Sequence, residues 1–271
     1  MMPIFSLNPI AILLLWLVAA FALIWTGPIF FPAAGSTVGV PALLWKLFAA
    51  SVALFITLAC LRRSSGLLGL RPSMRTFGLF ALGVASGVAL VGLWMAAFGL
   101  LVPFRLAPGT ITARGLAASW CIYVFGALLE ELAFRGHALI RLRQHYGAIP
   151  AVLCVSLAFG VLHLPGMTGV NAIKIIALTG CSSLLFCLAY LSSGSLWAAI
   201  GLHAGMNFML HSILGAGGGS GPSLMMPVYA AATAPGYDAA FWSLMLVQLV
   251  CTAGLLLAWP QRPANLRWQA R

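Results

Sequence analysis

Eight apolar segments, each about long enough to cross a lipid bilayer, constrain the fold of this chain more than any other feature. A spanning helix needs roughly 20 mostly apolar residues. The mean hydropathy of +1.07 and the 6% of charged side chains are far from the composition of a water-soluble domain. The segments are residues 10–31, 41–61, 77–102, 115–140, 148–164, 173–192, 195–214 and 240–258. We expect an all-α, polytopic membrane helix bundle of about eight transmembrane helices that forms one domain, residues 1–271.

Basic residues lie mainly between these segments and predict their orientation. The net charge of +11 comes from 14 Lys and Arg against three acids. Arginines follow the second, fourth and eighth segments, and positive connections stay on the cytoplasmic side of a membrane. They are Arg62, Arg63, Arg71, Arg75, Arg141, Arg143, Arg262, Arg267 and Arg271. The pattern predicts a multi-pass protein of the cell's inner or plasma membrane, with both termini cytoplasmic. It argues against a nucleic-acid partner, because no exposed basic stripe interleaves with aromatic residues.

The connection at residues 215–239 is long and rich in glycine, which predicts a flexible loop. A phosphate-binding loop is disfavoured, because no Lys-Ser or Lys-Thr follows the glycines. The six cysteines all lie in or beside apolar segments and show no paired ligand spacing. We interpret them as small apolar packing residues.

Two of the three acids, Glu130 and Glu131, stand side by side within the fourth apolar segment. A charged side chain at the centre of a bilayer helix costs about 2.5–3.5 kcal/mol on insertion scales. Arg135 lies four residues after Glu131, on the same helix face, and can form a charge-assisted pair with it. Glu130 lies about 100° around the helix and has no local partner. An unpaired carboxyl group in low dielectric is a candidate proton acceptor. A salt-bridged link between helices is the structural alternative.

Imidazole and amide groups occur in two later segments. His163 ends the fifth segment, with Phe159 one helical turn earlier, and the seventh segment carries His203 and Asn207 four residues apart. Glycines beside these two allow another helix to approach closely. Each residue alone is compatible with a structural role. Together they could orient a water molecule and stabilise an oxyanion, which hydrolysis of an acyl bond requires in addition to a base.

Three motifs occur in a fixed order within residues 115–214. They are Glu130-Glu131-x-x-x-Arg135, Phe159-x-x-x-His163 and His203-x-x-x-Asn207. This series resembles that of the CAAX-protease and bacteriocin-processing family, also called CPBP or Abi, which includes the type II CAAX prenyl endopeptidases. The resemblance implies a glutamic-type intramembrane endopeptidase with its catalytic core at 115–214. Its substrate would be a membrane-associated protein or peptide, lipidated or bearing a leader.

The resemblance also implies a role for each motif residue. Glu130 would activate the water, His163 would orient it, and His203 and Asn207 would hold the oxyanion. Glu131, Arg135 and Phe159 would support them. His211 continues the stripe of His203 and Asn207 but is not part of the motif series. Straight spans would place Glu130 nearer the cytoplasmic end than His163, and a longer or tilted fourth helix would bring the two level.

Two alternatives remain open from the residues alone. A metalloprotease could use Glu130, His163 and His203 as zinc ligands with one open position for water. We predict no cofactor, because no His-Glu-x-x-His pair is present and few carboxylates could support ligand imidazoles. A proton-coupled transporter or channel would also use buried Glu and His. The polar residues cluster in three segments without an inverted repeat of broken helices, which favours a protease.

Overall fold

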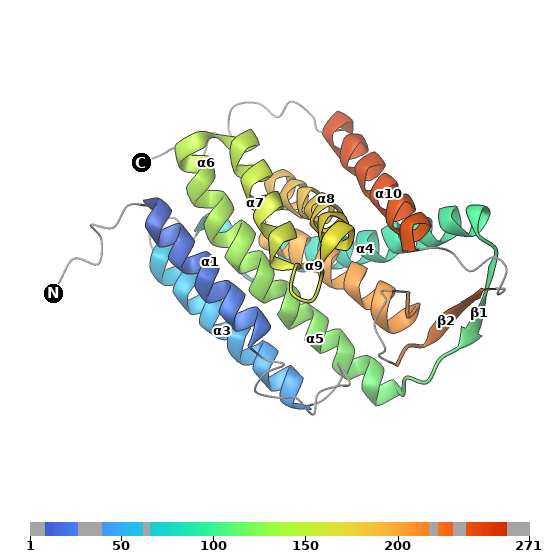
Figure 1. The fold of residues 1–271 in the computed structure, drawn as a ribbon. Coiled ribbons are helices and arrows are strands. Elements are labelled where there is room, and N and C mark those ends of the chain that lie inside the picture. Colours follow the sequence, from blue (N-terminus) through green and yellow to red (C-terminus); the bar gives the residue numbers. More distant parts are fainter. Residues whose placement is uncertain (1–8, 27–39, 62–65, 217–221, 230–236, 259–271) are drawn as a thin grey trace.

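The computed structural model describes residues 9–26, 40–61, 66–216, 222–229 and 237–258, and these form a bundle of helices (Figure 1). In chain order the helices are α1 (Pro9–Trp25), α3 (Val40–Leu61), α4 (Met74–Leu101), α5 (Ala113–Glu131), α6 (Ile140–Tyr146), α7 (Ala148–Leu162), α8 (Gly169–Ser193), α9 (Leu196–Asn207) and α10 (Tyr237–Ala258). Two π-helical segments, η3 (Leu132–Leu139) and η4 (Phe208–Ile213), join α5 to α6 and extend α9.

The described residues thus contain eight continuous helices, one for each apolar segment. Five are long and apolar enough to cross a membrane. These are Val40–Ala59, Met74–Leu101, Ala113–Tyr146, Gly169–Ser193 and Asp238–Leu256. The all-α bundle is confirmed, whereas the number of crossings and the orientation stay predictions. Parts of the predictions lie outside the described residues, namely 27–31, Arg62, Arg63, the glycines at 217–219 and 221, Arg262, Arg267 and Arg271.

Large apolar side chains cover the outer faces of the helices. Phe55 is 74% exposed, Leu100 88% and Ile149 74%. A protein surrounded by water rarely exposes contiguous apolar surface on this scale. Together with the five long apolar helices, this surface fits an integral, multi-pass membrane protein.

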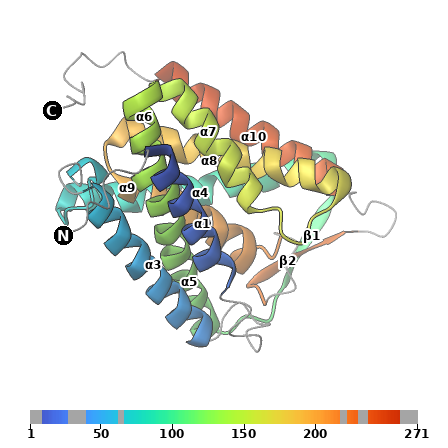
Figure 2. The same ribbon diagram turned by 60° about the vertical axis from the view of Figure 1, so that its left-hand side comes forward.

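A two-stranded antiparallel sheet corrects part of the prediction that residues 215–239 form a flexible loop. Strand β1 (Phe104–Pro108) pairs with β2 (Met225–Tyr229), which lies within the segment predicted as a flexible loop (Figure 2). Phe104 of β1 and Tyr229 of β2 lie opposite each other in the sheet. The centroids of their rings lie 6.3 and 6.2 Å from that of buried Phe98. Burial of this aromatic cluster accounts for the pairing, because cross-strand aromatic contacts stabilise short sheets.

Glycines bring α4 and α9 into close contact, as the sequence predicted for the glycines of the seventh segment. A Cβ added at Gly201 would overlap the carbonyl oxygen of Phe80, and one at Gly205 would overlap Val84 on the same helix. His203 lies two residues from each glycine, about 200° around the helix. The contact with α4 therefore turns the opposite face of α9, with His203, toward the interior of the bundle.

We expect Gly201→Ala to destabilise the protein by about 1–3 kcal/mol, because the added methyl group forces two closely packed backbones apart. Thermal unfolding in detergent measures the effect. Gly92→Ala on α4 is the matched control, since a Cβ there would meet nothing within 4 Å. Equal stability of the two variants would contradict the assigned contact.

Candidate active site

The two adjacent acids are the last residues of α5, at a change in helix type. Thr112 caps the start of α5 by accepting a hydrogen bond from the backbone N–H of Gly115. Directly after Glu131 the chain becomes π-helical, and it does so again directly after Asn207. Single π-helical turns inside α-helices occur frequently at functional sites. Each π-helical segment therefore begins directly after a residue of the predicted motifs, η3 after Glu131 and η4 after Asn207.

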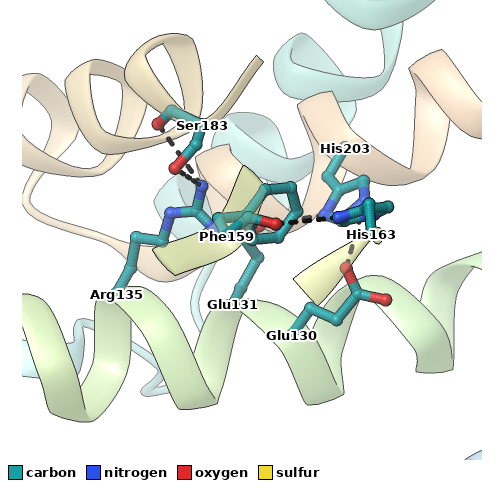
Figure 3. Close-up of polar contacts among 7 residues, drawn as sticks. All are labelled: Glu130, Glu131, Arg135, Phe159, His163, Ser183 and His203. Carbon is teal, nitrogen blue, oxygen red and sulfur yellow. Dashed lines mark hydrogen bonds and ion pairs between the residues drawn. The ribbon is translucent and has the colours of Figure 1, made fainter. Parts of the chain in front are cut away.

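The predicted pair between Glu131 and Arg135 is present and fully buried, with both side chains at 0% exposure. Arg135 Nη1 donates to Glu131 Oε1 at 3.1 Å, and Nη2 donates to Ser183 Oγ at 2.6 Å and to the Ser183 carbonyl oxygen at 3.3 Å (Figure 3). The guanidinium carbon lies 4.6 Å from the ring centroid of Phe159 and 5.2 Å from that of Phe186. Hydrogen bonds and aromatic faces together offset the removal of this cation from water.

His203 connects the two acids. Its Nδ1 lies 2.9 Å from Glu131 Oε1, and its Nε2 lies 3.8 Å from Glu130 Oε2 (Figure 3). Because the carboxylate that pairs with Arg135 can only accept, Nδ1 carries the hydrogen and Nε2 is the nitrogen that faces Glu130. The imidazole also stacks on Phe186, with 4.5 Å between centroids and 15° between planes. Glu131 and Phe186 thus fix the orientation of His203.

Glu130 differs from Glu131 in how its oxygens are used. Its side chain is 13% exposed, and its Oε2 is buried without a hydrogen-bond partner among the described residues. Buried polar atoms of native proteins usually have partners, so an exception requires an explanation. Glu131 Oε2 also lacks a partner, but Glu131 Oε1 binds both Arg135 and His203, whereas neither oxygen of Glu130 forms a hydrogen bond with another described residue. The structure therefore leaves one carboxylate of the two available to a reactant.

His163 lies at the end of α7, next to the ring that also contacts His203. Its Nδ1 donates to the carbonyl oxygen of Phe159 at 2.8 Å, and the Phe159 ring lies 4.8 Å from His163 and 5.9 Å from His203. Trp25 on α1 donates to the carbonyl oxygen of Leu162 at 3.0 Å and holds this end of α7. His163 Nε2 forms no hydrogen bond with another described residue. Figure 3 shows both imidazoles on the same side of the helix that carries Glu130.

Glu130, Glu131, His163 and His203 are thus brought together, whereas Asn207 is not joined to them. Asn207 is partly buried at the end of α9 and makes no side-chain hydrogen bond with another described residue. It lies one turn from His203 on the same helix. Its role at an oxyanion stays a prediction.

The helix through α5, η3 and α6 bears on the depth of Glu130. This helix runs over 34 residues, Ala113–Tyr146, and is longer than the segment 115–140 predicted from hydropathy. Glu130 lies near its middle rather than toward one end. Whether this length brings Glu130 level with His163 in the membrane stays a prediction.

The residues around Glu130 do not fit a three-ligand metal site in this arrangement. No group of three or more His, Cys, Asp or Glu side chains in the described part of the chain is placed to hold a metal ion. Nδ1 of both imidazoles is bound to a protein oxygen, which leaves Nε2 as the nitrogen that could bind a metal, so the zinc set of Glu130, His163 and His203 stays an alternative prediction. We derive no step through a metal.

Sequence reasoning missed Ser183 and Phe186, which bind Arg135 and His203. Neither residue stands out in α8, because small hydroxyl residues and phenylalanines are common in membrane helices. His211, noted as an extension of the polar stripe, stacks on Tyr123 of α5, with 5.8 Å between ring centroids. The structure records no contact between His211 and either Glu130 or Glu131.

Comparison with known families agrees with the motifs. Residues 112–209 match the model of the family described as Type II CAAX prenyl endopeptidase Rce1-like. No curated protein matches the chain. The matched segment contains every residue of the three motifs and both acids of the site. The family indicates a protease of the membrane that acts on a membrane-associated peptide. The match of residues 112–209 is thus to the family of Rce1-like type II CAAX prenyl endopeptidases, which the order of the motifs predicted.

Proposed function

We propose that the protein hydrolyses a peptide bond of a lipid-anchored or otherwise membrane-bound substrate, with Glu130 as the base that activates water. The observation that carries this proposal is the different use of the two carboxylates. Glu131 is held through Oε1 by Arg135 and His203, whereas neither oxygen of Glu130 forms a hydrogen bond with another described residue and its recorded contact is with His203 Nε2 at 3.8 Å. A carboxylate held in place but not consumed by the fold can accept a proton from a reactant.

In the proposed reaction, Glu130 takes a proton from a water molecule, and the oxygen of that water attacks the scissile carbonyl carbon. His163 orients the water through Nε2. In this step His203 carries a hydrogen on both ring nitrogens, and its Nε2–H and the Asn207 amide, on one face of α9, donate hydrogen bonds to the oxyanion of the tetrahedral intermediate. Collapse of the intermediate breaks the carbon–nitrogen bond, and Glu130 returns its proton to the leaving amine. Glu131 and Arg135 do not react but keep His203 in position.

The substrate class follows from the matched family and the surroundings of the site. The family description names prenyl endopeptidases, so we propose that the substrate carries a lipid anchor near the bond that is cut. The apolar outer surface of the helices allows such an anchor to approach within the bilayer. The bilayer is then the medium that delivers the substrate.

Mapping of protein termini in cells with and without this protein tests the proposal. We expect membrane-bound proteins whose terminus is shortened only when the protein is present, and cleavage by the purified protein in vesicles that persists with a chelator. Abolition by chelator and restoration by zinc would replace the glutamic mechanism with a metal-dependent one. Proton-coupled transport without any cut product would favour the transporter alternative.

A further inference from the structure

Three buried polar side chains meet where α1 and α3 pack against the π-helical segment η3. Both views show α1 and α3 beside the helix formed by α5, η3 and α6 (Figure 1, Figure 2). Trp16 of α1, Thr57 of α3 and His137 of η3 are 3%, 0% and 1% exposed. The ring centroids of Trp16 and His137 lie 6.0 Å apart, edge to face. The methyl carbon of Thr57 lies 3.5 Å from a Cβ built on Gly136, the residue before His137. The three side chains therefore share one interface.

Four polar atoms of these side chains have no hydrogen-bond partner among the described residues. They are Trp16 Nε1, Thr57 Oγ1 and both ring nitrogens of His137. Buried polar atoms of native proteins usually have partners, and bound water supplies the partner where the protein does not. A concentration of such atoms at one interface therefore points to a bound molecule that is not part of the chain.

The same kinds of group are satisfied elsewhere in this chain. Thr179 and Thr252 each donate to the carbonyl oxygen four residues earlier at 2.7 Å, a bond that helical threonines commonly make. The hydroxyl of Thr57 does not make this bond. Four other tryptophans donate from Nε1 to residues on other segments, namely Trp25, Trp45, Trp94 and Trp197. Unpartnered atoms are thus not a general feature of these residue types here, and the interface of α1, α3 and η3 is an exception.

The donors and acceptors at this interface define what it can bind. Trp16 Nε1 only donates, the Thr57 hydroxyl donates or accepts, and a neutral imidazole has one donor and one acceptor nitrogen. His137 is neutral, because the three acids of the chain are engaged elsewhere and a buried imidazolium would lack a carboxylate. An anion could not donate to the imidazole, and a metal cation could not accept the indole hydrogen. Water both donates and accepts, so it can serve all four atoms.

From these observations we infer that Trp16, Thr57 and His137 form a buried water-binding site, which joins α1 and α3 to the helix that carries the two acids. The site is separate from the proposed reaction. Arg135, two residues before His137, binds Ser183 of α8 about half a turn around the helix. Because buried water molecules with several hydrogen bonds are costly to remove, this site stabilises the attachment of α1 to the bundle.

Thr57→Val distinguishes a bound water molecule from a hydroxyl without any partner, because valine keeps the shape of the side chain and removes only the hydroxyl. With water bound, the variant loses one hydrogen bond, and we expect Tm in detergent to fall by about 2–4 °C. Without it, valine suits the apolar surroundings better and Tm rises. Thr252→Val is the matched control, since Thr252 is also buried but bonds within its own helix, and its Tm should change less. A raised or unchanged Tm in Thr57→Val, or an equal fall in the control, overturns the inference.

Solid-state NMR of the wild-type protein detects the water directly. The full chain, with isotope-labelled histidine, is placed in phosphatidylcholine vesicles, and the ring signals of His137 are assigned by their loss in His137→Gln. We expect one protonated and one unprotonated ring nitrogen, and magnetisation transfer from water to this ring although the side chain is 1% exposed. The transfer should weaken in Thr57→Val. Absence of transfer in wild type overturns the inference, and so does protonation of both nitrogens, which would indicate a bound anion in place of water.

Discussion

Replacing Glu130 with glutamine is expected to lower kcat by about 10²- to 10⁴-fold, the usual contribution of a general base. Glutamine keeps the shape of the side chain and removes only its ability to accept a proton. Folding should be little affected, because Glu130 Oε2 makes no hydrogen bond with another described residue. Initial rates in vesicles and thermal unfolding in detergent measure the two effects on the same preparation.

Glu131→Gln is the matched control for this experiment, since the same chemical change is made one residue away. There we expect both stability and activity to fall, because Arg135 and His203 lose the carboxylate that they share. Near-normal cleavage by Glu130→Gln, or a loss of stability as large as that of the control, would contradict the role assigned to Glu130.

Replacing Arg135 with leucine is expected to destabilise the protein by about 3–5 kcal/mol, the loss found when one partner of a buried pair is removed. The change leaves the carboxylate of Glu131 at 0% exposure without its cation. It also removes two hydrogen bonds to Ser183 and the contacts with the rings of Phe159 and Phe186. Unfolding in detergent, monitored by tryptophan fluorescence, measures the loss.

The double variant Arg135→Leu with Glu131→Leu should be more stable than Arg135→Leu alone, because no uncompensated charge remains. Its activity should nevertheless stay low, since His203 Nδ1 then has no carboxylate to orient it. Equal stability of the single and double variants would contradict the pairing. Recovery of activity in the double variant would show that Glu131 does not position His203.

Hydropathy was sufficient to predict the helices but not their ends or the sheet. The apolar segments coincide with eight helices because the bilayer requires length and apolar composition, and both are local properties of the sequence. The fourth segment was predicted to end at residue 140, yet its helix continues to Tyr146 through a π-helical stretch that leaves no mark on composition. The pairing of β1 with β2 joins distant parts of the chain, and neither strand carries a local signal of its partner.

The same distinction applies to the site. The contact between Glu131 and Arg135 was predictable because helix geometry alone places residues four apart on one face. The contact between Glu131 and His203 depends on the rotation of α9 relative to α5, which close packing of glycines against α4 determines. Ser183 contributes only because α8 passes beside Arg135. Contacts between side chains on different helices therefore could not be predicted from the sequence alone.

We expect the long helix that carries Glu130 to make the protein sensitive to the thickness of its bilayer. At about 1.5 Å per residue, 34 helical residues measure roughly 51 Å, against a hydrocarbon core of about 30 Å. Such a helix tilts, projects beyond the bilayer or thickens it locally. Longer acyl chains would reduce the tilt and shift Glu130 relative to the headgroups, whereas shorter chains would do the reverse. In the proposed reaction, we therefore expect membrane thickness to decide which bond of an anchored substrate lies level with the carboxylate.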